Sequence, residues 1–173
     1  MEKQEIVNFI RDNNTQLIAL LSSLSQEEIN TVPFEGSWTA GELSGHLIKS
    51  ISSFIKLLND KVEATEANFP DRVDLIKTSM LDFSKKFTFP GFIVPAKINY
   101  KKDEILVTLN SLNEDMIQSV VSLDLTKTCT LFELPGVGKI TRREAAWFVV
   151  YHTHRHIHQL KNIVNKIKDQ KNA

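Results

Sequence analysis

Residues 141–168, TRREAAWFVVYHTHRHIHQLKNIVNKIK, carry an uninterrupted helical pattern. The segment contains no Gly or Pro and opens with Thr141, followed three residues later by Glu144, which is the pattern of a helix capping box. Apolar residues recur at the three- and four-residue spacing of one buried helix face: Ala146, Val149, Val150, Ile157, Leu160, Val164 and Ile167. The segment therefore predicts one long helix packed against other helices.

Three further segments, at about 2–24, 39–59 and 103–123, show the same periodicity, and the second also opens with a capping box, Thr39 to Glu42. The expected buried face of the first comprises Ile6, Phe9, Ile10, Leu17, Leu20, Leu21 and Leu24. A short turn capped by Ser25 is expected to follow it. Four long helices without a convincing set of strands predict an all-α fold, a helical bundle in one domain, 1–173.

The connections are less regular. Residues 70–86 carry a shorter helical pattern through Val73, Ile76, Met80 and Phe83. Residues 87–100 and 125–139 contain Pro and Gly and are predicted to be loops, the second with a short extended piece near 129–132.

Composition excludes several classes of function. The 173 residues include 21 basic and 21 acidic side chains, so the formal net charge is zero, which argues against a nucleic-acid partner and a polybasic membrane anchor. The strongly apolar run Ala145–Tyr151 is too short to span a bilayer, and the N-terminus lacks the apolar core of a signal peptide. A cytoplasmic protein is expected. The single cysteine, Cys129, cannot form a disulfide within the chain and is expected to be buried.

Four of the five histidines lie between His152 and His158. Residues four apart share a helix face, so His152 can pair with His156, and His154 with His158. At about 100° per residue, His156 and His152 lie roughly 50° and 90° from the centre of the apolar stripe, and the other two lie roughly 110° and 150° away. We therefore expect His152 and His156 to face the bundle groove, and His154 and His158 to face solvent or a partner.

The fifth histidine, His46, lies on the flank of the second helix. If the second and last helices are neighbours, His46, His152 and His156 converge on one point. Three imidazoles can hold Zn²⁺, Ni²⁺ or a similar ion and leave a position open, as catalytic sites do. A solvated face or a subunit contact would explain the same spacing. The segment is not a zincin motif, since Thr153 follows His152 where that motif has Glu.

Two segments resemble those of the DinB-like superfamily. Residues 37–47, SWTAGELSGHL, resemble its Trp-Ser-x-x-Glu-x-x-x-His segment, and residues 152–160, HTHRHIHQL, resemble its closing His-x-x-x-His-x-x-Gln segment. The resemblance implies an up-and-down four-helix bundle with a right-handed, crossed-over arrangement, often dimeric, with metal ligands at His46, His152 and His156. Where relatives often have a small residue, this chain has His158, which leaves His154 and His158 as an alternative pair of ligands. Gln159 and the apolar stripe favour the first set.

The resemblance also implies a function: one divalent metal ion, zinc or nickel, acting as a Lewis acid on a small-molecule substrate. Hydrolysis and transfer of a low-molecular-weight thiol would both use that chemistry. Glu42 is a candidate partner for a ligating imidazole, although its role as a helix cap competes with this. The alternative from another class is a non-enzymatic metal-binding or stress-response dimer.

The same rotation places Trp147 and Phe148 away from the apolar stripe of the last helix. Exposed aromatic side chains are common at interfaces, so a homodimer is expected. In the alternative, the loop at 89–94 folds back and covers these rings. Arg142 and Arg143 lie in the first turn of the same helix, where they oppose its dipole; solvation, a ligand anion or a partner carboxylate would explain them.

Overall fold

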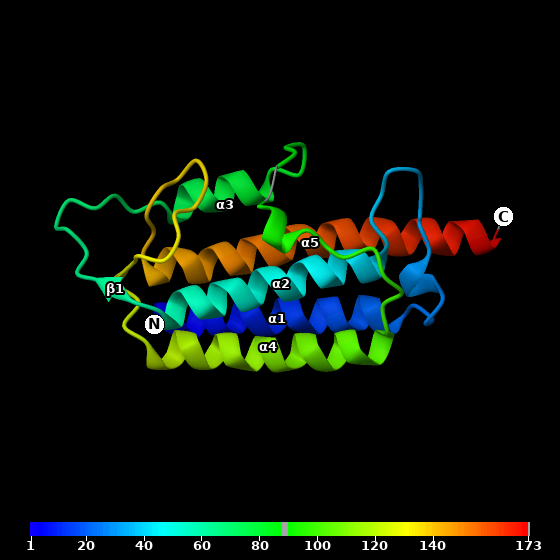
Figure 1. The fold of residues 1–173 in the computed structure, drawn as a ribbon, viewed down its shortest axis with the longest axis horizontal. Helices are drawn as coiled ribbons and strands as arrows, with labels where there is room; N and C mark the ends of the chain where they lie inside the picture. Colours follow the sequence, from blue (N-terminus) through cyan, green and yellow to red (C-terminus); the bar gives the residue numbers. More distant parts are fainter. Residues whose placement is uncertain (88–89, 173) are drawn as a thin grey trace.

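A computed structural model describes residues 1–87 and 90–172 of the chain. The molecule is built on four long helices that lie side by side in Figure 1: α1 (Glu2–Ser22), α2 (Ala40–Asn59), α4 (Lys102–Ser122) and α5 (Arg142–Asn172). The predicted all-α four-helix bundle is confirmed. The predicted helix ends agree with the observed ones to within a few residues.

The helices are not arranged in chain order. Helix α1 packs on α4 and α5, and α2 also packs on α4 and α5, so α1 and α2 lie diagonally across the bundle. The colours of Figure 1 show that α1 and α5 run in one direction and that α2 and α4 run in the other. Because a long crossover joins α2 to α4, the simple alternation of directions is interrupted there. This arrangement makes α2 and α5 neighbours.

Short elements fill the connections: η1 (Glu28–Asn30), β1 (Val62–Glu63), α3 (Val73–Leu81), η2 (Gly91–Ile93) and β2 (Thr128–Cys129). Helix α3 packs on α5 and is shorter than the periodicity of 70–86 suggested. Strands β1 and β2 pair antiparallel at one end of the bundle, with Val62 opposite Cys129. The extended piece thus begins one residue before the predicted range, and its two-residue partner strand has no sequence signal of its own.

Both predicted capping boxes are present. The backbone N–H of Thr39 donates to the Glu42 carboxylate at 2.9 Å, and the N–H of Glu42 donates to the Thr39 hydroxyl at 3.0 Å. At the start of α5, the N–H of Thr141 donates to Glu144 at 2.8 Å, and that of Glu144 donates to Thr141 at 3.2 Å. These reciprocal bonds satisfy backbone donors that a helix start otherwise leaves unpaired.

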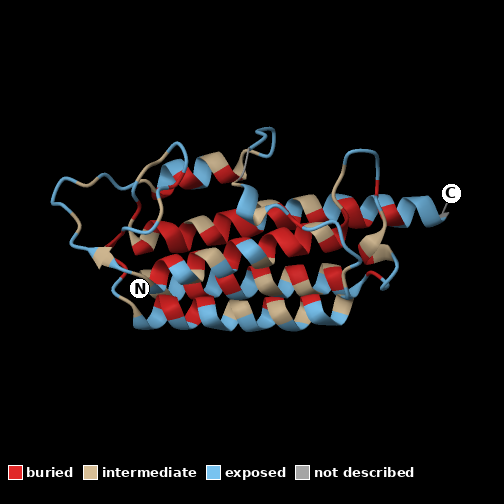
Figure 2. Ribbon diagram, in the orientation of Figure 1, coloured by how far each residue is buried: buried red, intermediate tan, exposed pale blue. Residues whose placement is uncertain are grey.

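The core lies between the four long helices. Helices α2 and α5 carry the densest buried stretches in Figure 2, since other elements cover them on several sides. The first helix follows its predicted face with one error: Phe9 is 43% exposed, and Asn13 is buried with its amide donating to the Val150 carbonyl at 2.9 Å. Phe83, predicted as part of a helical stripe, lies beyond the end of α3 and is exposed.

The expected exposure of Trp147 and Phe148 was wrong. Trp147 is 4% exposed, because Phe9 packs edge-on against it at 5.7 Å and its indole N–H donates to Glu2 at 3.0 Å. Phe148 is half-buried and stacks on Phe54 of α2 at 4.7 Å. Helix α5 packs on α1, α2 and α3, so neither ring lies on an exposed helix face as the prediction held. The alternative prediction was that the loop at 89–94 covers these two rings. It involves Phe89, which lies outside the described residues. Self-association stays a prediction.

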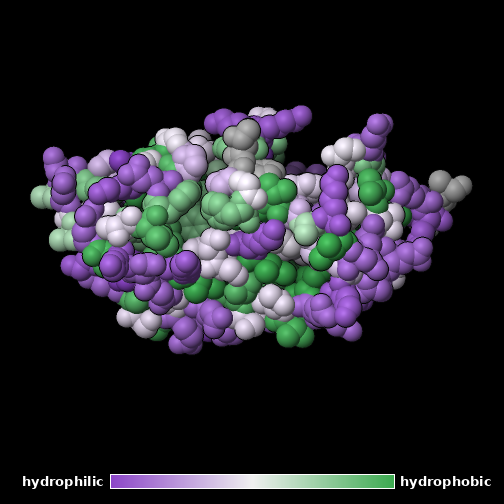
Figure 3. All heavy atoms as spheres, viewed as in Figure 1, coloured by the Kyte–Doolittle hydropathy of each residue, from purple (hydrophilic) through white to green (hydrophobic). Residues whose placement is uncertain are grey.

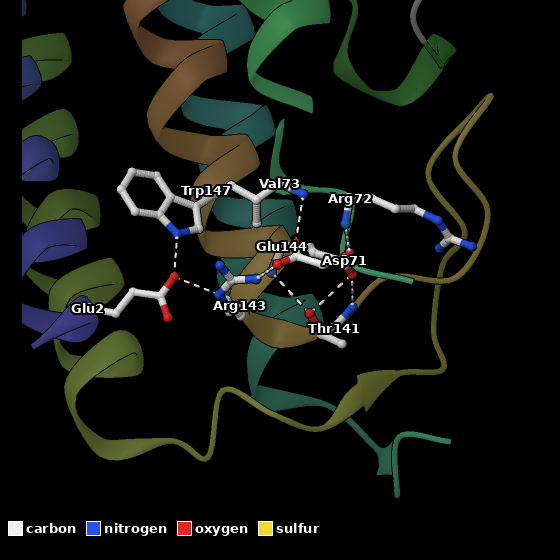
Figure 4. Close-up of polar contacts among 8 residues, drawn as sticks. All are labelled: Glu2, Asp71, Arg72, Val73, Thr141, Arg143, Glu144 and Trp147. Atoms are coloured by element: carbon white, nitrogen blue, oxygen red, sulfur yellow. Dashed lines mark hydrogen bonds and ion pairs between the residues drawn. The ribbon is translucent and has the colours of Figure 1, made fainter. Parts of the chain in front are cut away.

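Arg143 finds its carboxylates within the chain. Figure 4 shows its guanidinium between Glu2 of α1, at 2.5 Å, and Asp71 in the segment before α3, at 2.8 Å. Arg142 is buried and donates to the backbone carbonyl of Leu58 at 2.7 Å. These bonds account for two basic side chains in the first turn of α5 without a ligand anion.

Two further sequence-based expectations concern burial and membranes. Cys129 is fully buried, and desolvation raises the pKa of its thiol to about 11, so it is held as an inert thiol. Within residues 1–87 and 90–172, no helix is both long and apolar enough to cross a bilayer.

Candidate metal centre

Helices α2 and α5 bring three histidines together. His46 is on α2, and His152 and His156 occupy consecutive turns of the facing side of α5. All three are buried, with His46 only 1% exposed, whereas His154 and His158 are exposed. The expectation about which histidine pair faces the groove is therefore confirmed. The ring of His158 instead stacks on Phe83, with 4.0 Å between centroids.

The three imidazoles converge through the same ring nitrogen. Nε2 of His152 lies 3.3 Å from Nε2 of His46 and 3.0 Å from Nε2 of His156. The donor atoms of the group all lie within 4.8 Å of one another. Zinc–nitrogen bonds of about 2.0–2.1 Å place the nitrogens of a tetrahedral site about 3.3 Å apart. The spacing suits a single small ion.

Two carbonyl oxygens set the protonation of the cluster. Nδ1 of His46 lies 2.9 Å from the backbone carbonyl oxygen of Ile93, and Nδ1 of His156 lies 3.0 Å from the side-chain oxygen of Gln159. A carbonyl oxygen accepts and cannot donate, so both Nδ1 atoms carry the proton. The Nε2 atoms of His46 and His156 therefore present lone pairs toward His152, which is the tautomer that binds a metal.

Burial keeps these imidazoles neutral. Desolvation lowers the pKa of all three histidines. The pKa of His46 falls below its ordinary value, that of His152 falls well below it, and that of His156 falls to about 3. The neighbouring imidazoles lower the pKa of His152 and His156 further, since positive charges on adjacent rings repel. Neutral histidine is the form that ligates metals, so the site is prepared for a cation rather than for protons.

The three imidazole nitrogens of the cluster fit a divalent ion. His46 and His156 both direct a lone pair at His152, which has at most one Nε2 proton to offer them. Because the ligand atoms of the three neutral imidazoles lie within 4.8 Å of one another, one cation can accept a lone pair from each of them. Zinc and nickel both accept imidazole ligands.

Glu42 does not take part in this centre. Its carboxylate is used by the capping box at the start of α2, as the competing interpretation held, and it is not among the clustered metal donors. The groups that orient the imidazoles are instead the Ile93 carbonyl and Gln159. Gln159 was signalled by the closing motif, but a backbone carbonyl such as that of Ile93 has no sequence signature.

The Ile93 carbonyl is brought to His46 by close packing of the loop before α4. Tyr100 at the end of this loop lies directly on α2, where a Cβ on Gly41 or Gly45 would be 2.9 Å or 2.5 Å from its nearest atom. Both glycines thus allow the aromatic side chain to approach the helix backbone. Glycine at positions 41 and 45, close to His46, is the feature of the sequence that reflects this contact.

A cleft opens at the histidines. Its volume is about 1140 Å³, and its walls come from α2, α3, α5, η2 and the loop around 131–137. In Figure 1, α3 lies above α5, and α5 lies above α2. All three clustered histidines line it. Ligand pockets commonly measure about 300–1,000 Å³, so there is room for a small-molecule substrate beside the centre.

The fold and the site together define a class of protein. It is a four-helix bundle with a buried cluster of three histidines between α2 and α5 that could hold a metal ion. The family model of the DinB superfamily matches residues 10–160, and the chain belongs to this family.

Two relatives extend the comparison. The chain is 24% identical over 148 residues to the uncharacterized protein YuaE of Bacillus subtilis (strain 168), which covers 86% of this chain and 90% of that protein. Among solved structures it is similar to YfiT from Bacillus subtilis, with a TM-score of 0.62 and 18% identity over 96% of this chain and 87% of YfiT. YfiT is described as a probable metal-dependent hydrolase with an unusual four-helix bundle topology. At 18% sequence identity, the similarity to YfiT shows that the two chains share a fold.

Proposed function

We propose that the protein is a metal-dependent hydrolase of small molecules, with one divalent ion held by Nε2 of His46, His152 and His156. The observation that carries the proposal is the convergence of three neutral imidazoles, by the same nitrogen, at a cleft wall. The description of YfiT as a probable metal-dependent hydrolase supports the reaction class.

Each part of the site has a distinct task. A divalent ion in such a site supplies a Lewis acid, which polarises a substrate oxygen and makes water more acidic. The three imidazoles leave coordination positions free for this, as catalytic zinc sites do. Ile93 and Gln159 hold two of the rings in the binding tautomer, and Trp38 packs on His46 with 5.2 Å between ring centroids.

Metal analysis tests the centre directly. Protein purified without a histidine tag and reconstituted with Zn²⁺ or Ni²⁺ is expected to hold about one ion per chain. Replacing His46, His152 or His156 with Ala should abolish tight binding, because two imidazoles form an incomplete site. His154→Ala and His158→Ala are matched controls from the same helix and should retain the ion.

The outcomes separate the alternatives. Absence of bound metal after reconstitution with several divalent ions would overturn the proposal, and loss of metal in the control variants alone would show that the other pair ligates. Loaded protein is then assayed on panels of esters and amides and on a thiol-transfer reaction. Hydrolysis that His46→Ala abolishes supports the proposed reaction. Thiol transfer alone would replace it, and no turnover in either panel would favour a non-enzymatic metal-binding protein.

A further inference from the structure

We propose that the cleft selects an organic anion with an aromatic or other bulky apolar body. This inference rests on the proposed function and names its substrate class. It is carried by two properties of the cleft wall, the sign of its charges and its aromatic content.

The charges that line the cleft have one sign. Four basic side chains contribute to the wall: Lys56, Lys85, Lys86 and Arg155. No Asp or Glu is among the described residues that line it. The chain as a whole has a net charge of zero, so this segregation is a local property. A cleft with low-dielectric walls and charges of one sign concentrates ligands of the opposite sign.

Two of these cations remain uncompensated. The carboxylate of Asp82, at the end of α3, lies 3.7 Å from Lys85 and offsets part of its charge, and the backbone carbonyl of Asp82 accepts a hydrogen bond from Arg155 at 2.8 Å. Lys56 and Lys86 have no carboxylate within 4.0 Å in the part of the chain that the structure describes, and both are exposed. They are free to meet a ligand's anionic group.

Aromatic side chains form much of the remaining wall: Trp38, Phe54, Phe83, Phe87, Phe132 and Phe148. Phe148 stacks on the metal-site residue His152 with 5.3 Å between centroids, so the apolar surface reaches the centre itself. In the view of Figure 3, hydrophobic side chains gather across the middle of the molecule, and hydrophilic ones lie toward both ends and along the upper and lower edges. An aromatic or branched ligand body buries apolar surface here.

Arg155 keeps the basic segment in place. Its guanidinium donates to the carbonyls of Met80, Asp82 and Lys85 and lies over the Phe87 ring, 4.8 Å from its centroid. These contacts attach the segment that carries Lys86 to α5 at Arg155, the residue directly before His156. Lys86 and the candidate metal centre therefore lie on connected parts of the cleft wall.

A pair of fluorescent probes tests charge selection without turnover. 8-Anilinonaphthalene-1-sulfonate and N-phenyl-1-naphthylamine share one aromatic body, and only the first is an anion. Titrated into metal-free protein, the anion is expected to bind at least tenfold more tightly, and this preference should shrink as salt is added. The double variant Lys56→Gln/Lys86→Gln should weaken anion binding about tenfold, from two charge contacts of under about 1 kcal/mol each, and leave the neutral probe unchanged.

The matched control is Lys166→Gln/Lys168→Gln, which removes two exposed charges from the far end of α5 outside the cleft. It should bind both probes as the parent does, and thermal unfolding of both double variants checks that they fold. Equal affinity for the two probes, or equal weakening in the control variant, would overturn the proposal. Because the protein is metal-free, failure of metal binding leaves this result readable, and charge selection can fail while the metal centre stands.

Discussion

The three clustered histidines are buried bases held in their neutral form. Their imidazoles ionise near pH 6.5 in an unfolded chain, but burial and mutual repulsion lower the pKa of His152 and His156 in the folded protein. The unfolded state therefore binds more protons than the folded state once the pH falls below about 6.5. Without a metal ion, the cluster costs stability in acid.

Acid titration of the metal-free protein measures this cost. The free energy of unfolding should be at its full value above about pH 6.5 and should fall below it, by about 1.4 kcal/mol per pH unit for each histidine that stays neutral when folded. For His156 the loss continues toward its folded pKa of about 3. Urea unfolding at pH 7, 6 and 5 gives the slope.

A single substitution isolates the histidine contribution from that of the carboxylates. His156→Leu should reduce the pH dependence of the unfolding free energy by the equivalent of about one proton. Asn165→Leu, at an exposed position of the same helix that carries no titratable group, should leave it as in the parent. Parallel slopes in all three proteins would show that the cluster is protonated in the folded state.

At the scale of elements, the contact between α2 and the loop before α4 links stability to ligand orientation. Gly41 and Gly45 lie inside α2, where glycine is less favourable than alanine by about 1 kcal/mol. They are explained by Tyr100, which occupies the space that a Cβ would need. The same loop carries the Ile93 carbonyl that accepts from His46.

Gly45→Ala tests this link. The added Cβ would lie 2.5 Å from the Tyr100 hydroxyl oxygen, so the Tyr100 side chain must shift and, where it positions the loop, take the loop with it. We expect a loss of about 1–3 kcal/mol in unfolding free energy, as for other overpacked sites, together with weaker metal binding because the Ile93 carbonyl leaves His46. Chemical denaturation and metal titration measure the two effects.

Gly91→Ala is the matched control, since a Cβ there meets nothing within 4 Å. It should change neither quantity by much. A Gly45→Ala protein that is more stable than the parent, as helix propensity alone predicts, would mean that Tyr100 adjusts freely and does not position the loop.

For the whole molecule, the candidate ion joins distant parts of the chain. His46 and His152 are 106 positions apart, and they connect α2 to α5 across the bundle. A ligand that binds only the folded state stabilises it by mass action, by about 4 kcal/mol at 1,000 times its Kd. For a chain of this size, that corresponds to a rise in Tm of roughly 10 °C.

Thermal unfolding with and without excess zinc measures this coupling. The parent and His154→Ala should show the full rise, and His46→Ala should show little, because it removes the contribution of α2. An equal rise in His46→Ala would place the stabilising ion elsewhere in the molecule.

Local patterns in the chain were enough to predict the four long helices, both capping boxes and the orientation of His152 and His156. Each of these depends on residues three or four positions apart, whose relation is set by the geometry of a single helix. The prediction failed at Trp147 and Phe9 because periodicity shows which helix face is most apolar, but not how many neighbours surround the helix.

The assembly of the site depended on contacts between segments far apart in sequence. That α2 lies beside α5 follows from the long crossover, and no local pattern encodes such a pairing. The carbonyl of Ile93 orients His46 through its backbone, which every residue type possesses, so it leaves no mark on the sequence. The cationic wall brings Lys56 and Lys86 from different elements to one cleft, although the net charge of the chain is zero. Composition records how many charges a chain has, and only folding determines where they meet.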